Sequence, residues 1–377
     1  MRSLLSSPLA KRRWKNFKAN RRAFYSLIIF LILTIIASMA EFVANDKPLL
    51  ASYRGDIIFP IFSGDVTEDQ FGGDEGLIAQ YKDPAIQCLI ITGGFIDCYD
   101  APEIIIKNVS EGLIIDSNFH KGWMIWPIIP YSFNTINHDV VPAPGSPNKS
   151  HWLGTDDTTR DVMARVIYGF RISVGFAVVV VFVSSIIGII AGAVMGYFGG
   201  WIDLIFQRVV EIWSNIPSLY IIIIMSAIFS MSFTLLTVLV ALFSWTALVG
   251  VVRAEFLRAR NFEYVRAARA LGLSNFKIIF RHVLPNAMVA TITMLPFLFT
   301  GAIGSLTSLD FLGFGLPPSY PSLGELALQA KQNLHAPWLA FTAFVVISVM
   351  LSLLVFIFEG VRAVSYTHLT LPTILLV

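Results

Sequence analysis

The side chains that could carry acid–base, nucleophilic or metal chemistry are few in this chain and lie far apart. Its 377 residues include six His and two Cys, and no nucleophile elbow of the G-x-S-x-G type accompanies the scattered histidines. The zinc-protease pattern H-E-x-x-H and the phosphate-binding loop G-x-x-x-x-G-K-[ST] are both missing from the sequence. We therefore expect neither catalysis nor ATP binding by this polypeptide itself.

The two cysteines, Cys88 and Cys98, fall in one polar stretch. Metal sites need more ligands at closer spacing, so zinc is not expected here. A disulfide would form if this stretch faces an oxidising compartment. The sequence leaves two interpretations open, a Cys88–Cys98 disulfide and two unrelated thiols.

The charged segment EYVRAARALGLSNFKIIFRHVLP, residues 263–285, lies between very apolar stretches. Its pattern predicts two short helices separated at Gly272, which would end the first helix in a left-handed conformation. Asn261 is the expected cap of the first helix, with Glu263 in its first turn, and Ser274 is the expected cap of the second. Pro285 closes the second helix or opens the next. The prediction is a rigid, bent knob.

Apolar residues recur on one face of each predicted helix: Val265, Ala268 and Leu271 on the first, and Phe276, Ile279, Phe280 and Val283 on the second. Ala267 and Ala268 are small enough for another surface to approach the backbone. The residues alone fit two partners. One is an anionic lipid surface that attracts the arginines, and the other is a soluble protein that receives the knob.

The composition of the whole chain indicates what must position this knob. Hydrophobic residues make up 55% and charged residues 14%, with a mean hydropathy of +0.70, whereas soluble domains contain about 25% charged residues. This is the composition of an integral membrane protein. The net charge of +2 gives no basis for binding nucleic acid.

Six apolar runs are long enough to cross about 30 Å of hydrocarbon as helices. They are residues 24–44, 172–197, 209–230, 233–252, 286–307 and 338–359. The first run is longer than the apolar core of a typical signal peptide, so we expect it to be retained. Within the second run, Ser184, Ser185 and the glycines of GIIAGAVMG are expected to let helices pack closely.

The distribution of charge orients these spans. Segment 1–22 carries basic residues without an acid, and segment 253–281 carries seven basic residues against two acidic ones, whereas residues 45–165 hold 17 acidic and eight basic residues. The positive-inside rule then places both termini and the knob in the cytoplasm and the acidic insert outside. Within the insert, the runs CLIITGGFI and PEIIIKN predict short strands.

The pattern E-Y-V-R-A-A-R-A-L-G followed by R-H-V-L-P-N resembles the EAA loop of ABC importer permeases. In that family this loop is the coupling helix, which fits a groove on the nucleotide-binding subunit. The resemblance implies a coupling role for Glu263, Arg266, Ala267, Ala268, Leu271, Gly272, Leu284 and Pro285. His282 stands where the motif often has Ile.

The stretch WLGTDDTTRDVMARVIYGFRIS, residues 152–173, is similar to a signature of the dipeptide and oligopeptide permeases. Its matching positions outside the membrane include Trp152, Gly154, Asp156, Arg160 and Asp161. Thr159 stands where that family usually has Gly, which predicts a stiffer turn. GYFGGWID (196–203), SLDFLGFGLPPSYPSLGEL (308–326) and the large insert after the first span are similar to the Yej-type branch that takes up peptides and microcin C.

The resemblance implies an all-α integral membrane protein of the type I ABC importer permease fold, with six transmembrane helices. In chain order it implies a basic cytoplasmic N-terminus (1–22), a first helix (23–44), a periplasmic insert with an interfacial helix (45–165), and a core of five helices with the coupling loop 253–285 (166–362). Residues 363–377 form an uncharged tail that departs from the family pattern and looks non-native.

The same resemblance implies a location in the bacterial inner membrane and a function in importing peptides or peptide-like solutes by alternating access. The implied partners are a second permease subunit, ATPase subunits that bind ATP and Mg²⁺, and a periplasmic solute-binding protein. This chain would bind no cofactor. Two alternatives are a stand-alone secondary transporter or channel, which predicts inverted repeats and paired membrane acids, and a membrane-anchored scaffold whose insert is the functional part.

Overall fold

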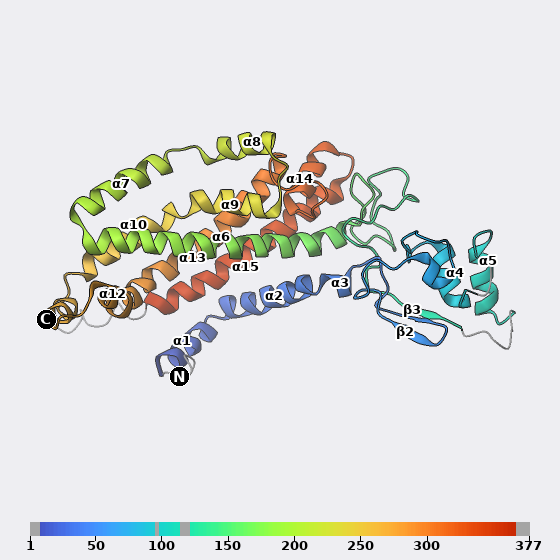
Figure 1. The fold of residues 1–377 in the computed structure, drawn as a ribbon, viewed down its shortest axis with the longest axis horizontal. Coiled ribbons are helices and arrows are strands. Elements are labelled where there is room, and N and C mark those ends of the chain that lie inside the picture. The colour runs from blue at the N-terminus through green and yellow to red at the C-terminus, as the bar shows by residue number, and fades with distance from the viewer. Residues whose placement is uncertain (1–7, 95–97, 114–120, 367–377) are drawn as a thin grey trace. The chain divides into compact units, whose positions relative to one another are not determined.

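The computed structural model describes residues 8–94, 98–113 and 121–366. The chain forms two compact units (Figure 1). The first, the helical unit, comprises Met1–Ile35 and Gly169–Val377, and the second, the insert unit, comprises Ile36–Tyr168. The last part of the tail that looks non-native, residues 367–377, lies outside the described residues.

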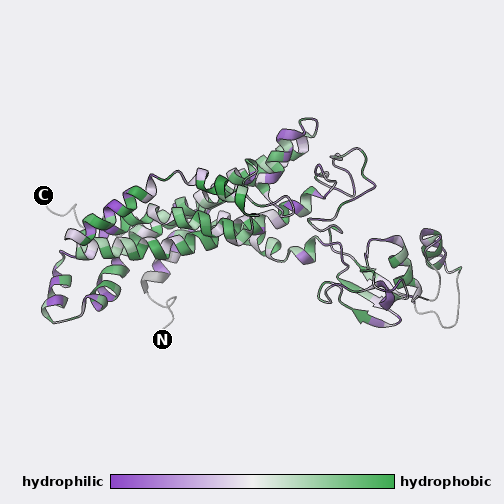
Figure 2. Cartoon of the chain, turned by 45° about the horizontal axis from the view of Figure 1, so that its top comes forward, coloured by the Kyte–Doolittle hydropathy of each residue, from purple (hydrophilic) through white to green (hydrophobic). Residues whose placement is uncertain are grey.

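The helical unit is built almost entirely from helices. In chain order they are α1 (Pro8–Ala19), α2 (Arg21–Ser38), α6 (Val162–Phe198), α7 (Gly200–Ser214), α8 (Ser218–Ile228), α9 (Phe233–Ser244), α10 (Thr246–Ala259), α11 (Glu263–Ala270), α12 (Asn275–Ile278), a π-helical turn (Ile279–Val283), α13 (Leu284–Phe311), α14 (Leu323–Gln332) and α15 (Pro337–Tyr366). The long helices are apolar along most of their length (Figure 2).

Within the described residues, five helical stretches are long and apolar enough to cross a membrane. They are Arg21–Ser38, Val162–Phe198, Phe233–Ala259, Asn275–Phe311 and Pro337–Ala363. The bent pair α7 and α8 supplies a sixth span if it crosses as one unit, in agreement with the six spans predicted from the sequence.

The bend between α7 and α8 is the main departure from the predicted spans. The sequence predicts a single helical span at 209–230, but the two helices meet at 61° across a break of three residues. Pro217 explains the break, because proline donates no backbone hydrogen bond and disfavours a helical conformation in the residue before it. Pro217 itself is extended, with φ −70° and ψ 96°.

Glycines along α6 bring it into close contact with α10, as the sequence predicts. A Cβ added at Gly188 would lie 2.7 Å from the carbonyl oxygen of Trp245, and one at Gly196 would lie 2.6 Å from that of Arg253. Gly192, between them, faces Val252 at a similar distance. Small residues every four positions let two membrane helices approach until their backbones touch, so α6 and α10 behave as one packed pair.

The insert unit contains a small antiparallel sheet in the order β2-β1-β3, formed by residues other than the two runs predicted as strands. The strands are β1 (Leu50–Tyr53), β2 (Asp56–Ile58) and β3 (Trp123–Ile125), and the helices are α3 (Ala40–Val43), a 3₁₀ turn (Glu68–Phe71), α4 (Pro84–Thr92) and α5 (Pro102–Ser110). Ala51 of β1 pairs with Ile58 of β2 and with Met124 of β3.

The two runs predicted as strands in the insert are wrong, because both lie largely in helices. CLIITGGFI begins inside α4, and PEIIIKN lies inside α5. The carboxylate of Asp83 caps α4 by accepting the N–H of Ala85 at 2.9 Å, and a proline occupies the first turn of each helix. Proline with its fixed φ favours the first helical turn, and this start signal outweighs the strand propensity of Ile and Val.

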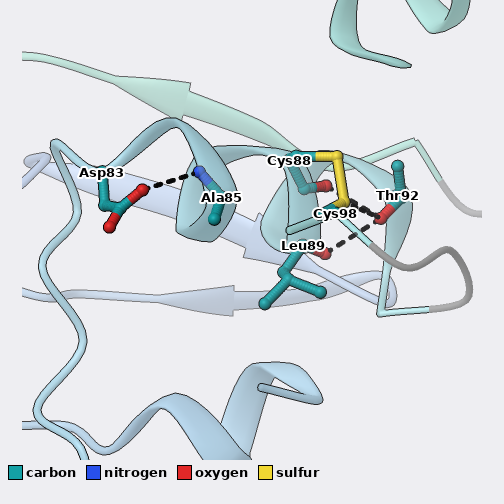
Figure 3. Close-up of a disulfide and its surroundings, with 6 residues drawn as sticks. All are labelled: Asp83, Ala85, Cys88, Leu89, Thr92 and Cys98. Carbon is teal, nitrogen blue, oxygen red and sulfur yellow. Dashed lines mark hydrogen bonds between the residues drawn. A yellow bond between two sulfur atoms is a disulfide. The ribbon is translucent and has the colours of Figure 1, made fainter. Parts of the chain in front are cut away.

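Cys88 and Cys98 form a disulfide with an S–S distance of 2.02 Å and a Cα–Cα distance of 5.8 Å (Figure 3). Both residues are fully buried in the core of the insert unit. The hydroxyl of Thr92 lies 3.7 Å from the Cys98 sulfur and donates to the carbonyl oxygen of Cys88 at 2.8 Å. The disulfide therefore links Cys88 of α4 to Cys98, ten residues further along the chain.

Candidate functional site

The charged segment forms a bent two-helix knob, which we define as residues 263–283. Gly272 ends α11 in the left-handed conformation with φ +77°, as predicted. The N–H of Leu273 bonds the carbonyl of Ala268 at 3.2 Å, and the N–H of Gly272 bonds that of Arg269 at 3.0 Å. This is the Schellman arrangement, which satisfies the free carbonyls at a helix end. Ser274 then caps α12 by accepting the N–H of Lys277.

The inner face of the knob belongs to a buried cluster shared with the long helices. Val265 and Ala268 of α11, Ile278 of α12 and Val283 of the π-helical turn are at most 5% exposed. They belong to one cluster with Ala193 and Tyr197 of α6, Val252, Phe256 and Ala259 near the end of α10, and Ala287 of α13. The knob and these three helices therefore share one packed core.

Three details of the predicted knob are wrong. Asn261 does not cap α11: its side chain donates to the carbonyl of Leu257 at 3.3 Å, and Phe262 occupies the cap position. Leu271 leaves the apolar face and is 82% exposed, because the helix has ended by that residue. Phe276 and Phe280 also point outward, and Ile278 fills the core in their place.

A contact that the sequence does not reveal ties the knob to the end of α6. The hydroxyl of Tyr197 donates to Oδ1 of Asn275 at 2.8 Å, and Tyr197 is itself only 4% exposed. The guanidinium of Arg269 lies 5.6 Å from the centre of the same ring, within range of a cation–π interaction. Arg269 thus holds the knob to its own protein. Tyr197 belongs to the GYFGGWID motif, but the motif alone does not indicate that Tyr197 contacts Asn275.

A second polar contact joins the knob to α13. The amide of Asn286 donates to the hydroxyl of Tyr264 at 3.3 Å and to the carbonyl of His282 at 2.9 Å. Pro285 lies in the first turn of α13, so it opens the next helix rather than closing α12. The chain therefore runs from the knob into a membrane span without a flexible linker.

The outer face of the knob combines exposed aromatic and aliphatic side chains with basic ones. Leu271, Phe276 and Phe280 are between 51% and 82% exposed, and the rings of the two phenylalanines lie 4.4 Å apart. Arg266, Lys277 and Arg281 are exposed on the same segment. We call these six residues the docking face. Exposed apolar groups beside cations suit either a protein groove with an acidic rim or an anionic lipid surface.

The remaining residues of the predicted coupling set lie around this face. Glu263, Ala267 and Pro285 are exposed, Leu284 is half-buried, and Ala268 is buried in the core. The structure therefore places the set in the knob and in the adjoining first turn of α13, and divides it between an exposed surface and a core. Ala268 packs in the core and does not form part of the exposed surface.

The second predicted set, in the insert unit, forms a buried polar turn that starts α6. The carboxylate of Asp156 accepts the backbone N–H of Arg160 at 2.9 Å and its Nε at 2.8 Å, and lies 3.5 Å from Nε of Arg165. Asp161 caps α6 by accepting the N–H of Ala164 at 2.8 Å, and its other oxygen lies 2.8 Å from Nδ1 of His151. Since each of these side chains is at least nine-tenths buried, the turn is a structural joint.

Gly154 and Thr159 both have left-handed φ, +75° and +61°. Thr159 is strained there, because a β-branched residue rarely adopts this conformation. Its hydroxyl offsets part of the strain by accepting the N–H of Asn137 at 3.1 Å. Trp152 is 54% exposed and stays outside the buried turn.

A stacked column of aromatic and charged groups lies beside this turn. Nζ of Lys82 lies 3.4 Å from the centre of the Tyr131 ring, which in turn lies 4.4 Å from the His151 ring. Burial lowers the pKa of Lys82 to about 8, although the charges of Asp46 and Asp161 act to raise it. Burial also raises the pKa of Tyr131. Within the described part of the chain, no group of three His, Cys, Asp or Glu is placed to hold a metal ion.

Comparisons with known proteins match most of the chain. Residues 184–366 match the family described as "binding-protein-dependent transport system inner membrane component", and residues 7–57 match the N-terminal transmembrane domain of oligopeptide transport permease C. The peptidoglycan transport system permease protein YejE of Agrobacterium fabrum is 50% identical over 383 residues, which cover 94% of this chain and 92% of that protein.

The inner membrane ABC transporter permease protein YejE of Escherichia coli is 46% identical over 357 residues, covering 94% of this chain and 96% of that protein. Among solved structures, a chain of the inward-facing MetNI methionine ABC transporter is similar with a TM-score of 0.46 and 19% identity, covering 54% of this chain and 97% of that one.

Proposed function

The chain belongs to the family of inner-membrane permease components of binding-protein-dependent transport systems, and from that premise we propose that it is one of two transmembrane subunits of an ATP-driven importer of peptides or peptide-like solutes. The relatives named YejE cover nearly the whole chain, insert included. The relative from Agrobacterium fabrum is a peptidoglycan transport system permease protein. The solutes we propose are short peptides, peptide-bearing wall fragments and microcin C-type compounds.

The observation that carries the proposal is the construction of the knob. Its docking face is exposed, while its inner face is continuous with the core of α6, α10 and α13. A lipid-binding hairpin needs only an amphipathic surface, whereas a part that transmits force must be rigidly joined to the helices it moves. The Tyr197–Asn275 bond and the Schellman turn at Gly272 meet that requirement.

In this arrangement the docking face receives an ATPase subunit, and the partner subunits bind and hydrolyse ATP with Mg²⁺. Their closure displaces the knob, and the shared core passes the displacement to the spans, which open alternately to the two sides. A second permease subunit completes the pathway. A periplasmic solute-binding protein delivers the solute to the outer face.

The topology follows from charge. We place both termini and the knob in the cytoplasm and the acidic insert in the periplasm. The disulfide between Cys88 and Cys98 supports this placement, because disulfides persist in the periplasm and are rare in the cytosol.

Reconstitution in proteoliposomes tests the function. The chain is assembled with its second permease, its ATPase subunits and its binding protein, and peptide uptake is measured together with ATP hydrolysis. Leu271→Asp places a charge on the docking face, and the matched control Leu334→Asp changes an equally exposed leucine between α14 and α15.

We expect Leu271→Asp to abolish stimulated ATP hydrolysis and uptake, and Leu334→Asp to retain both. Uptake by the purified chain alone, driven by an ion gradient, would instead identify a secondary transporter.

A further inference from the structure

Helix α7 stands apart from the rest of the helical unit. All 15 of its residues are described, and among them only Asp203 is buried. Its apolar side chains face outward: Trp201 is 79% exposed, Ile205 60% and Ile212 69%. Figure 1 shows α7 and α8 running along one side of the helical unit. Because α7 packs so little against the other helices, its few specific contacts must fix its position.

The first fixed point is an ion pair between Asp203 and Arg253 of α10. Nε of Arg253 donates to one carboxylate oxygen at 2.5 Å, and Nη2 donates to the other at 2.7 Å. Two parallel hydrogen bonds between a guanidinium and a carboxylate fix orientation as well as distance. The pair joins residues 50 positions apart in the sequence, and its side chains are mostly buried, with Asp203 12% and Arg253 31% exposed.

The second fixed point lies at the other end of α7. The indole N–H of Trp213 donates to the carbonyl of Leu242 in α9 at 2.9 Å, and its ring stacks on Phe243 at 5.7 Å. The chain then breaks at residues 215–217 before α8 begins. Helix α7 is therefore a lever held at both ends, with a break directly beyond its second support.

The two ends of α7 lie near different elements: its start is paired with α10, which shares a core with the knob, and its end leads to α8, which lines a hollow. Arg253 lies between Val252 and Phe256, whose side chains share the buried core with Val265 and Ile278 of the knob. Beyond the break, Ser218 of α8 lines a hollow of about 420 Å³ together with residues of α9 and α13, among them Ser244 and Ser308. All the residues that line this hollow are uncharged.

We propose that the Asp203–Arg253 pair is the joint through which movement of the knob reaches the bent span, so that α8 shifts against α13 and the hollow between them opens or closes. Both are positioning residues, and the inference rests on the proposed coupling function of the knob. Movement enters α10 through the shared core, passes to α7 through the ion pair, and turns α7 about Trp213. The break at 215–217 lets α8 respond without bending a continuous helix.

Substitutions at the joint test the proposal in the assembled importer. Asp203→Asn removes the charge while retaining the side chain's size, and Arg253→Lys keeps the charge but cannot form the paired hydrogen bonds. The double variant Asp203→Arg with Arg253→Asp exchanges the two side chains, so an ion pair can form with the carboxylate on α10 and the guanidinium on α7. The matched control is Arg208→Gln, which breaks an ion pair within α7, between Arg208, 79% exposed, and Glu211 at 2.6 Å.

The measured quantity is the number of peptides imported per ATP hydrolysed in proteoliposomes. We expect Asp203→Asn and Arg253→Lys to keep stimulated ATP hydrolysis within about twofold of the parent and to lower the ratio by roughly fivefold or more, in the range by which coupling substitutions act. The exchanged variant should recover part of the ratio, and Arg208→Gln should match the parent.

An unchanged ratio in Arg253→Lys overturns the proposal. Failure of both single variants to assemble with the ATPase also overturns it, because the pair would then serve only folding. These outcomes are separable from failure of the proposed function, in which Leu271→Asp would leave transport and ATP hydrolysis intact whatever the joint does.

A structural readout checks the same path without activity. Nitroxide labels on cysteines introduced at Ser218 and Ser308 report the distance across the hollow in the assembled importer, and the native cysteines are buried in a disulfide and do not react. ATP should shift this distance in the parent and in Arg208→Gln but not in Asp203→Asn. A shift that persists in Asp203→Asn overturns the proposal.

Discussion

The left-handed turn at Gly272 offers a perturbation whose size can be worked out from the backbone alone. No atom lies within 4 Å of a Cβ added at this glycine, so Gly272→Ala introduces no clash. What remains is the cost of φ +77° for a residue with a side chain, about 1–2 kcal/mol. The knob can adopt another turn if that costs less than the strain. The strain energy is therefore the largest amount by which the binding free energy of the ATPase subunit can be weakened. It corresponds to a fall in ATPase affinity of up to about 5- to 30-fold.

A titration of the detergent-solubilised permease pair with its ATPase subunits measures this effect as a shift in half-saturation. Asn tolerates the left-handed region better than Ala, and a β-branched residue tolerates it worst. The expected order of affinity is therefore Gly, Asn, Ala, Val. The matched control is Gly250→Ala, which also has open space but lies within α10, where alanine is favoured. Parent-like affinity for both Gly272→Ala and Gly272→Val would refute the reasoning.

Three further predictions concern the insert. Alkylation without reductant should leave Cys88 and Cys98 unlabelled by mass spectrometry, and replacing either by Ser should lower the unfolding free energy of the insert by about 2–3 kcal/mol. Thr159→Val should lower the melting temperature, because it loses the hydrogen bond from Asn137 and keeps the strained φ, whereas Thr159→Gly should lower it less or raise it. The folded pKa of Lys82 is about 8, below its ordinary value of 10.5. Between these pH values the unfolded chain binds more protons than the folded one, so the free energy of unfolding should rise with pH. A denaturant titration over this range should show the rise in the parent and not in Lys82→Met.

The spans and the knob were predictable from sequence because their signals are local. Apolar runs give the spans, and the spacing of Gly272 and Ser274 gives the turn and the second cap. The glycines of α6 likewise predict close packing, although not that α10 is the helix they meet. Each of these features can be read from one continuous stretch of the sequence.

The errors arise where tertiary contacts or start signals outweigh periodicity. Leu271 fits the apolar spacing of α11, but the helix ends before it and the side chain points to solvent. Prolines in the first turns of α4 and α5 start helices in runs whose Ile and Val content favours strands. The Asp203–Arg253 pair could not be predicted at all, because 50 residues separate its members and each alone resembles an interfacial charge.

The central claim is that the docking face of the knob receives an ATPase subunit. A photoreactive amino acid at position 271, where the side chain is 82% exposed, tests it directly in the assembled importer. We expect illumination to join the permease covalently to the ATPase, with a yield that changes when ATP is added, and to give no such product from position 334. Crosslinking to lipid alone at position 271, with the ATPase present and active, would contradict the account.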